Sequence, residues 1–118
     1  MTTPVIYGIP NCDTVKKVFT WFKANNLPFE FHNYKTEGIS AAKLKEWAKL
    51  TDWETFFNKK STTWKELAPS LENETLNQAK AFKLMQEHTS IIKRPVIETN
   101  GTIVVGFNEA QYTKQFLS

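Results

Sequence analysis

The feature that most constrains the fold is the segment of residues 5–19, where strand-like spacing gives way to helical spacing across a short turn. Val5, Ile6 and Tyr7 form a β-branched and aromatic run typical of a buried strand. Beyond the turn, apolar residues recur at the spacing of one helix face: Val15, Val18, Phe19 and Phe22. The pattern predicts a strand near residue 5 and a helix over residues 14–24.

The only cysteine of the chain, Cys12, stands between this strand and this helix. Asp13 is expected to cap the helix, because its carboxylate can accept a hydrogen bond from a free N–H group of the first turn. The positive end of the helix dipole favours an anion at this place. Helix N-termini and nearby cations lower the pKa of a thiol from about 8.5 to roughly 3.5–7.5. Cys12 is therefore a candidate nucleophile.

The rest of the chain predicts a second strand at residues 29–34, a helical stretch at 40–88, a hairpin at 96–105 and a last helix capped by Asn108. A right-handed crossover makes the first two strands parallel and puts Cys12 at a carboxyl edge of the sheet, where ligands bind in open α/β folds. Asn100-Gly101 is a strong hairpin signal. The predicted caps within the helical stretch are Ser40, Thr51, Thr63 and Asn73.

Composition narrows the function classes. The net charge of +3 comes from lysines scattered among acidic residues, and Arg94 is the only arginine, so we expect no nucleic-acid partner. No apolar run approaches the roughly 20 residues of a membrane span. A single cysteine and no signal sequence predict a cytoplasmic, soluble protein, expected to be a monomer. His32 and His88 are isolated and are interpreted as structural, so neither a metal site nor a tightly bound cofactor is expected. The tryptophans at helical spacing, Trp47, Trp53 and Trp64, are interpreted as core.

A βαβ half, a helical interlude and a ββα half form the layout of the thioredoxin-like α/β fold, with a mixed four-stranded sheet. Four motifs are also similar to the arsenate reductase ArsC/Spx family, and most of all to its YffB-type branch: residues 7–17 (YGIPNCDTVKK), 31–34 (FHNY), 62–64 (TTW) and 92–96 (IKRPV). The resemblance implies one ArsC-like domain over residues 1–118, with the core in 1–37 and 91–118 and a helical insertion in 38–90. It also implies a cis bond before Pro95, facing the cysteine turn.

The resemblance implies a nucleophilic role for Cys12 and an anion-binding role for Arg94. Two further arginines expected of an arsenate reductase are replaced, at residues 57–60 (FNKK) and 105–107 (VGF). Lysine does not bind an oxyanion in the bidentate way of arginine, so arsenate reduction is the weaker alternative. Spx-type regulators carry Cys-x-x-Cys, whereas Val15 holds the second position here. An internal disulfide switch is therefore impossible.

We hypothesise that the Cys12 thiolate exchanges disulfides with glutathione as co-substrate, and that an external thiol regenerates it. Arg94 and Lys16 would hold the carboxylates of the tripeptide, the strand edge beside Pro95 would pair with its backbone, and Asn11 flanks the thiol. Free cysteines are also often buried as small apolar residues. The alternative is therefore an inert Cys12 in a Spx-like, non-enzymatic module that binds a protein partner.

Overall fold

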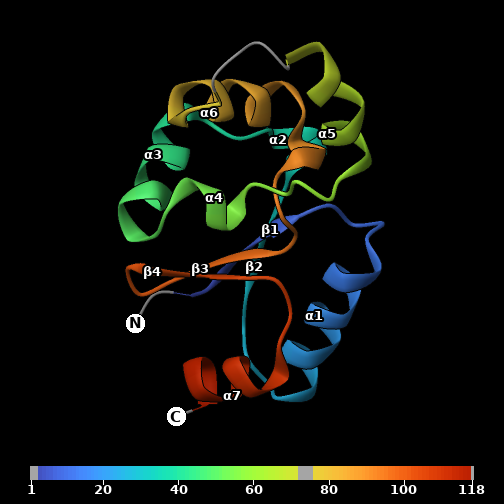
Figure 1. Ribbon diagram of the computed structural model, residues 1–118. Helices are drawn as coiled ribbons and strands as arrows, with labels where there is room; N and C mark the ends of the chain where they lie inside the picture. The colour runs from blue at the N-terminus through green and yellow to red at the C-terminus, as the bar shows by residue number, and fades with distance from the viewer. Residues whose placement is uncertain (1–2, 72–75, 118) are drawn as a thin grey trace.

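A four-stranded mixed sheet lies at the centre of the computed structural model, which describes residues 3–71 and 76–117 (Figure 1). Strand β1 (Val5–Gly8) pairs in parallel with β2 (Glu30–Asn33) and antiparallel with β3 (Val96–Thr99). Strand β4 (Thr102–Val105) pairs antiparallel with β3, giving the order β2-β1-β3-β4. The prediction of a thioredoxin-like α/β fold with a mixed sheet is confirmed.

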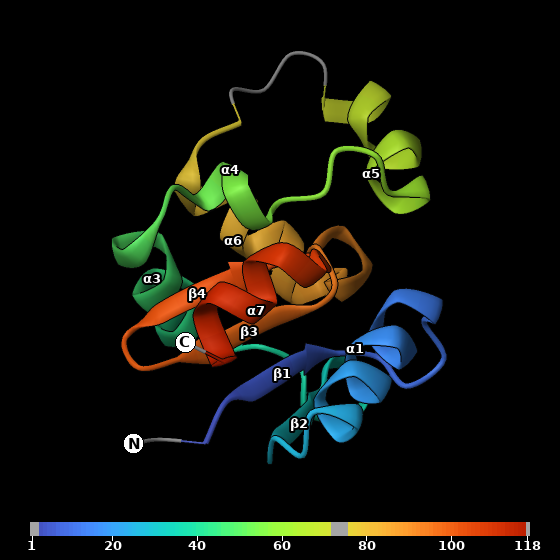
Figure 2. The same cartoon turned by 90° about the horizontal axis from the view of Figure 1, so that it is seen from below.

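Helices cover both faces of this sheet (Figures 1 and 2). The helices α1 (Asp13–Ala24) and α7 (Glu109–Leu117) lie on one face. The other face is covered by residues 34–71 and 76–91, called the helical region below. Its elements are α2 (Tyr34–Glu37), α3 (Ala41–Leu50), α4 (Trp53–Phe56), α5 (Thr62–Leu67), the 3-10 turn η1 (Ala68–Leu71), α6 (Gln78–Glu87) and the 3-10 turn η2 (Thr89–Ile91).

The alternation of side chains along the strands divides the core into two clusters. Ile6 and Ile97 point to the α1 and α7 face, where they pack with Val18, Phe22, Val104 and Tyr112. Their neighbours Tyr7 and Val96 point to the helical region and join a larger cluster that includes Trp47, Phe56 and Met85. Trp47 is fully buried, and Trp53 and Trp64 pack against this cluster. The interpretation of these tryptophans as core is confirmed.

Several predicted element boundaries are confirmed. Ser40 caps α3 by accepting a hydrogen bond from the Lys43 N–H at 3.1 Å. Asn108 accepts one from the Gln111 N–H at 3.0 Å at the start of α7. Asn100 and Gly101 both have positive φ, 44° and 76°, as the hairpin turn requires.

Other predicted caps are wrong by one or two residues. Helix α1 begins at Asp13, so the N-cap is Cys12 itself. Helix α5 is capped by Ser61, whose hydroxyl accepts the Trp64 N–H at 3.1 Å, while the hydroxyl of the predicted cap, Thr63, is bonded to the Ser90 hydroxyl at 2.6 Å. Asp52, not Thr51, holds the N-cap position of α4. The predicted cap Asn73 lies outside the described residues, and α6 is capped by Asn77.

Candidate active site

The candidate site lies at the edge of the sheet where β1 and β2 end and β3 begins. Cys12 follows the carboxyl end of β1. Tyr7 pairs with Val96, so the next position along each strand places Gly8 beside Pro95. The turn that carries Cys12 and the loop that enters β3 therefore meet at one edge of the sheet, on the right in Figure 1. This register brings Cys12, Arg94 and Pro95 to the same end of the molecule.

Cys12 caps α1 in an extended conformation, with φ −105° and ψ 126°. Its carbonyl accepts the Lys16 N–H at 3.0 Å, while its side chain makes no capping hydrogen bond. The thiol is free and partly exposed. Cys12 thus stands at the positive end of the α1 dipole, where a negatively charged sulfur is stabilised.

Arg94 and Pro95 form the second side of the candidate site, opposite the Cys12 turn. The peptide bond between them is cis, as the family resemblance implied. Pro95 is buried, and its carbonyl accepts the Gly106 N–H at 2.8 Å, which ties this loop to the end of β4. Arg94 is partly buried and makes no ion pair with any residue in the described ranges.

Tyr34 lies on the same edge, just after β2, and its pKa is influenced by the charge of Arg94. Burial raises the pKa of the Tyr34 hydroxyl well above its ordinary value, and the nearby Tyr7 adds to the rise, while the positive charge of Arg94 opposes it. The Tyr34 hydroxyl is the only buried side-chain polar atom without a hydrogen-bond partner in the part of the chain that the structure describes. The positive charge of Arg94 therefore acts on a buried phenol.

The other two predicted site residues lie on the Cys12 side. Asn11 is exposed in the turn before α1. Lys16 is exposed one turn into α1 and lines a hollow between α1 and α7. The structure thus places Lys16 along α1, whereas Arg94 belongs to the opposite wall.

A hollow lined by lysines near the loop of Arg94 was not predicted, because residues 57–60 were considered only for the arginine they lack. Phe57 forms an isolated antiparallel bridge with Ile92, and the Lys93 N–H donates to the Phe56 carbonyl at 2.9 Å. The pairing creates a hollow of about 340 Å³ lined in part by Lys59, Lys60 and Lys93. No local signal could have found it, because the two segments meet only in the folded chain.

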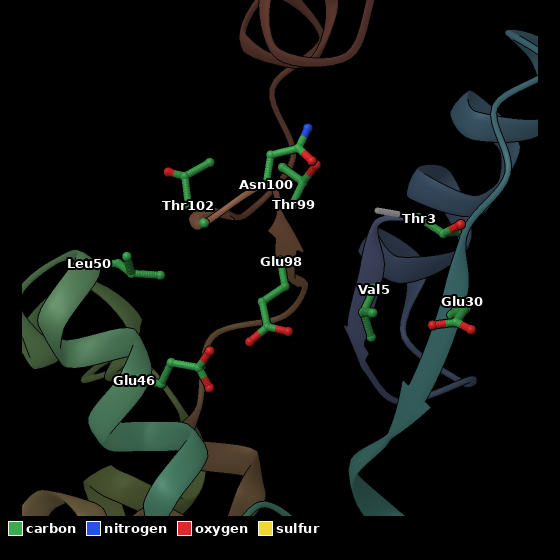
Figure 3. A pocket seen from close by; sticks show the side chains of 10 residues that line it. Thr3, Val5, Glu30, Glu46, Leu50, Glu98, Thr99, Asn100 and Thr102 are labelled. Atoms are coloured by element: carbon green, nitrogen blue, oxygen red, sulfur yellow. The ribbon is translucent and has the colours of Figure 1, made fainter. Parts of the chain in front are cut away.

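A second hollow, of about 420 Å³, lies at the opposite end of the sheet and does not share this chemistry (Figure 3). It is bordered by the β3–β4 hairpin and by Glu46 and Glu98. The Glu98 carboxylate already accepts hydrogen bonds from Tyr7, Lys43 and Trp47. The carboxylate of Glu98 therefore belongs to an internal hydrogen-bond network.

The two histidines belong to the framework. His32 Nε2 lies 2.6 Å from the Gly38 carbonyl oxygen, and His88 holds the C-cap position of α6. Within residues 3–71 and 76–117, no three His, Cys, Asp or Glu side chains gather to hold a metal ion. In the same ranges, no helix has the length and apolar character to cross a membrane.

Comparisons with known proteins agree with this geometry. The model of the ArsC family matches residues 7–115. An uncharacterized protein of Haemophilus influenzae is 36% identical over 111 residues, covering 94% of this chain and 96% of its own. The global transcriptional regulator Spx of Lactiplantibacillus plantarum is 26% identical over 107 residues, covering 89% and 80%.

Two solved structures resemble the chain over almost its full length. One is a protein named YFFB, with 39% identity and a TM-score of 0.88, covering 95% of this chain and 97% of its own. The other is an arsenate reductase (ArsC) related protein from Brucella melitensis, with 38% identity and a TM-score of 0.76, covering 98% and 95%.

Proposed function

Since the chain belongs to the ArsC family, in its ArsC/Spx, YffB-type group, we propose that it is a thiol reductase that uses Cys12 and glutathione in disulfide exchange. The observation that carries the proposal is the position of Cys12. Cys12 is partly exposed and holds the N-cap position of α1, at the edge where Arg94 and Pro95 also lie. A reaction that needs one activated thiol and a bound anionic peptide suits this arrangement.

The reaction takes two exchange steps. The Cys12 thiolate attacks one sulfur of a glutathione mixed disulfide, forming a Cys12–glutathione disulfide and expelling the other thiolate, which takes up a proton from water. A second glutathione thiolate then attacks the glutathione sulfur of that intermediate. This attack regenerates the Cys12 thiolate and releases glutathione disulfide. The second thiol must come from outside, because the chain has no other cysteine.

The cations of the site suit the substrate. Glutathione carries two carboxylates, and Arg94 has no ion-pair partner in the described ranges with which they would compete. The Arg94 guanidinium would bind one carboxylate in a bidentate way, and Lys16 would attract another as a point charge. Asn11 and Pro95 would frame the tripeptide beside the sulfur. We assign the protein to the cytoplasm, where glutathione is plentiful and free thiols persist.

The two alternatives are less well supported. An arsenate reductase would need several arginines around its oxyanion, and Arg94 is the only one in the chain. The lysines at 59, 60 and 93 add charge without bidentate geometry. A Spx-like regulatory role finds support in the 26% identity to Spx, but Val15 leaves no second cysteine in the helix turn. Binding of a protein partner is compatible both with disulfide exchange and with a regulatory role that involves no reaction.

Mass spectrometry of the chain after incubation with glutathione disulfide tests the proposal. We expect one glutathione per chain, released by added glutathione, and none on Cys12→Ser. Arg94→Gln should raise the KM for glutathione about tenfold, as loss of a charge-assisted pair implies. Lys45→Gln, an exposed change on α3, is the matched control and should behave as the parent. Full turnover by Cys12→Ser would refute the mechanism.

A further inference from the structure

The hollow between α1 and α7 has features that glutathione alone would not use. It encloses about 600 Å³. Two aromatic rings, Trp21 and Phe107, and the side chain of Ala24 supply its apolar part. Lys16 and Lys17 stand on its α1 side, and Glu109 on its α7 side. Both rings are only partly buried, so apolar surface remains open to a ligand.

The aromatic rings of this groove are held in place from below. The rings of Trp21 and Phe107 pack edge-on against Tyr112, with centroid distances of 5.3 and 5.2 Å. Tyr112 is fully buried, and its hydroxyl donates to the Gly106 carbonyl at 2.5 Å. This bond fixes the residue that precedes Phe107. The groove is therefore part of the folded core rather than a gap between loose side chains.

Both walls of the groove lead to the candidate active site. On one side, the Lys16 N–H is bonded to the Cys12 carbonyl at 3.0 Å. On the other side, the Gly106 N–H is bonded to the Pro95 carbonyl at 2.8 Å. A ligand in the groove thus lies between two segments that each continue directly to Cys12 or Pro95.

The charge of the groove favours an acidic partner. Lys16 and Lys17 are exposed and form no ion pair with any residue that the structure describes. They add to the positive end of α1. Glu109 is the first residue of α7, where the dipole of that helix offsets its charge. The two lysines therefore dominate the electrostatic attraction at the Cys12 end.

We propose that this groove binds a protein substrate through a large apolar side chain flanked by acidic residues. The proposal rests on the proposed function, since the bound segment would present its disulfide to Cys12. The apolar side chain would lie on Trp21 and Phe107, and a flanking carboxylate would pair with Lys17, since Lys16 is assigned to a glutathione carboxylate. Glutathione has no large apolar side chain for this surface, so the groove would favour a protein substrate over glutathione disulfide.

Fluorescence anisotropy with labelled peptides tests the groove without chemistry, because the chain used carries Cys12→Ser. The probes are three hexapeptides: one with phenylalanine between two aspartates, one with phenylalanine between two lysines, and one with alanine between two aspartates. We expect the first to bind about tenfold more tightly than either of the others. Equal binding of all three, or preference for the lysine peptide, would overturn the proposal.

Variants then locate the binding. Lys17→Glu should weaken the first peptide about tenfold, and Glu109→Lys should tighten it, whereas Lys45→Glu on α3 should change nothing. Phe107→Ala should remove the preference for phenylalanine over alanine. A Lys17→Glu chain that binds like Lys45→Glu would place the peptide elsewhere and refute the assignment. If the parent chain showed no disulfide exchange with glutathione, the proposed function would be contradicted, but the peptide-binding result would still stand.

Discussion

Replacement of Glu98 should reveal how firmly the helical region is fastened to the sheet. The Glu98 carboxylate accepts hydrogen bonds from the Tyr7 hydroxyl at 3.1 Å, the Lys43 ammonium at 2.9 Å and the Trp47 indole N–H at 2.8 Å. These donors come from β1 and α3, whereas Glu98 belongs to β3. One carboxylate thus joins the strand that leads to Cys12 to a helix on the opposite side.

The magnitude follows from what each donor loses. Glu98→Ala leaves the indole N–H of the fully buried Trp47 without a partner, which costs about 1–3 kcal/mol. The Lys43 ammonium is 28% exposed and regains water, so its loss adds only about 1 kcal/mol. The Tyr7 hydroxyl also loses its acceptor, which adds about 1 kcal/mol. We expect a total of about 3–5 kcal/mol in the free energy of unfolding. Glu98→Gln keeps an acceptor oxygen and should cost about 1–2 kcal/mol.

Urea unfolding followed by tryptophan fluorescence measures these differences. Glu46→Gln is the matched control, because Glu46 also pairs with Lys43, at 3.1 Å, but its side chain is 60% exposed. The control should change the free energy of unfolding by less than about 0.5 kcal/mol. If Glu98→Ala unfolded at the same urea concentration as Glu46→Gln, the network would carry no stability and the reasoning would fail.

The same carboxyl should make the free energy of unfolding decrease at acidic pH. Burial alone would raise the pKa of the Glu98 carboxyl, but the hydrogen bonds from Lys43 and Trp47 and the charge of Lys43 outweigh it and hold the pKa below the ordinary value of 4.5. The unfolded chain therefore takes up the proton at a higher pH than the folded chain. The contribution of Glu98 is complete above about pH 4.5 and is lost as the pH falls through the folded pKa. In Glu98→Gln the free energy of unfolding should decrease less steeply as the pH falls below about 4.5.

Two further pairs of substitutions test the packing around the candidate site, both by urea unfolding. Tyr34→Phe removes a buried hydroxyl without a partner in the described residues, so it should leave the free energy of unfolding unchanged or raise it by up to about 1 kcal/mol. Tyr7→Phe removes a hydroxyl that is bonded to Glu98, so it should lower the free energy of unfolding by about 1 kcal/mol. A larger loss for Tyr34→Phe than for Tyr7→Phe would show that the Tyr34 hydroxyl is paired. Gly8→Ala would place a Cβ 2.8 Å from Val15 Cγ2 and should cost about 1–3 kcal/mol. Part of that cost should vanish in a Val15→Ala background, and strictly additive costs would contradict the steric cause.

The sheet was predictable because its signals are local. Alternation at Ile6 and Tyr7, and the positive φ tolerated by Asn100 and Gly101, act within a few residues of chain. The place of Cys12 at a carboxyl edge followed from the handedness of one βαβ crossover. The two strand pairs and the position of the candidate nucleophile therefore needed no long-range information, whereas the joining of both pairs through β1 and β3 followed from the likeness to the thioredoxin-like layout.

Helix caps were harder to predict, because neighbouring candidates differ by little free energy. Ser61 and Thr63 are both good N-cap residues, and the choice is worth about 1 kcal/mol. In the structure the Ser61 hydroxyl accepts the Trp64 N–H, while the Thr63 hydroxyl is bonded to that of Ser90, which is distant in sequence. At α1, Cys12 already holds the N-cap position without a side-chain bond, so Asp13 is left inside the first turn. Tertiary contacts override such small local preferences.

The position of Arg94 depends on contacts of this kind, and this is where the helical region bears on the site. The residue before Arg94 is fastened to the helical region, because the Lys93 N–H donates to the Phe56 carbonyl. The residue after it is fastened to the end of β4, because the Pro95 carbonyl accepts the Gly106 N–H. Arg94 is thus held between two anchors from different parts of the chain. The helical region therefore does more than cover the sheet, since it fixes one side of the loop that carries the only arginine toward the cysteine edge.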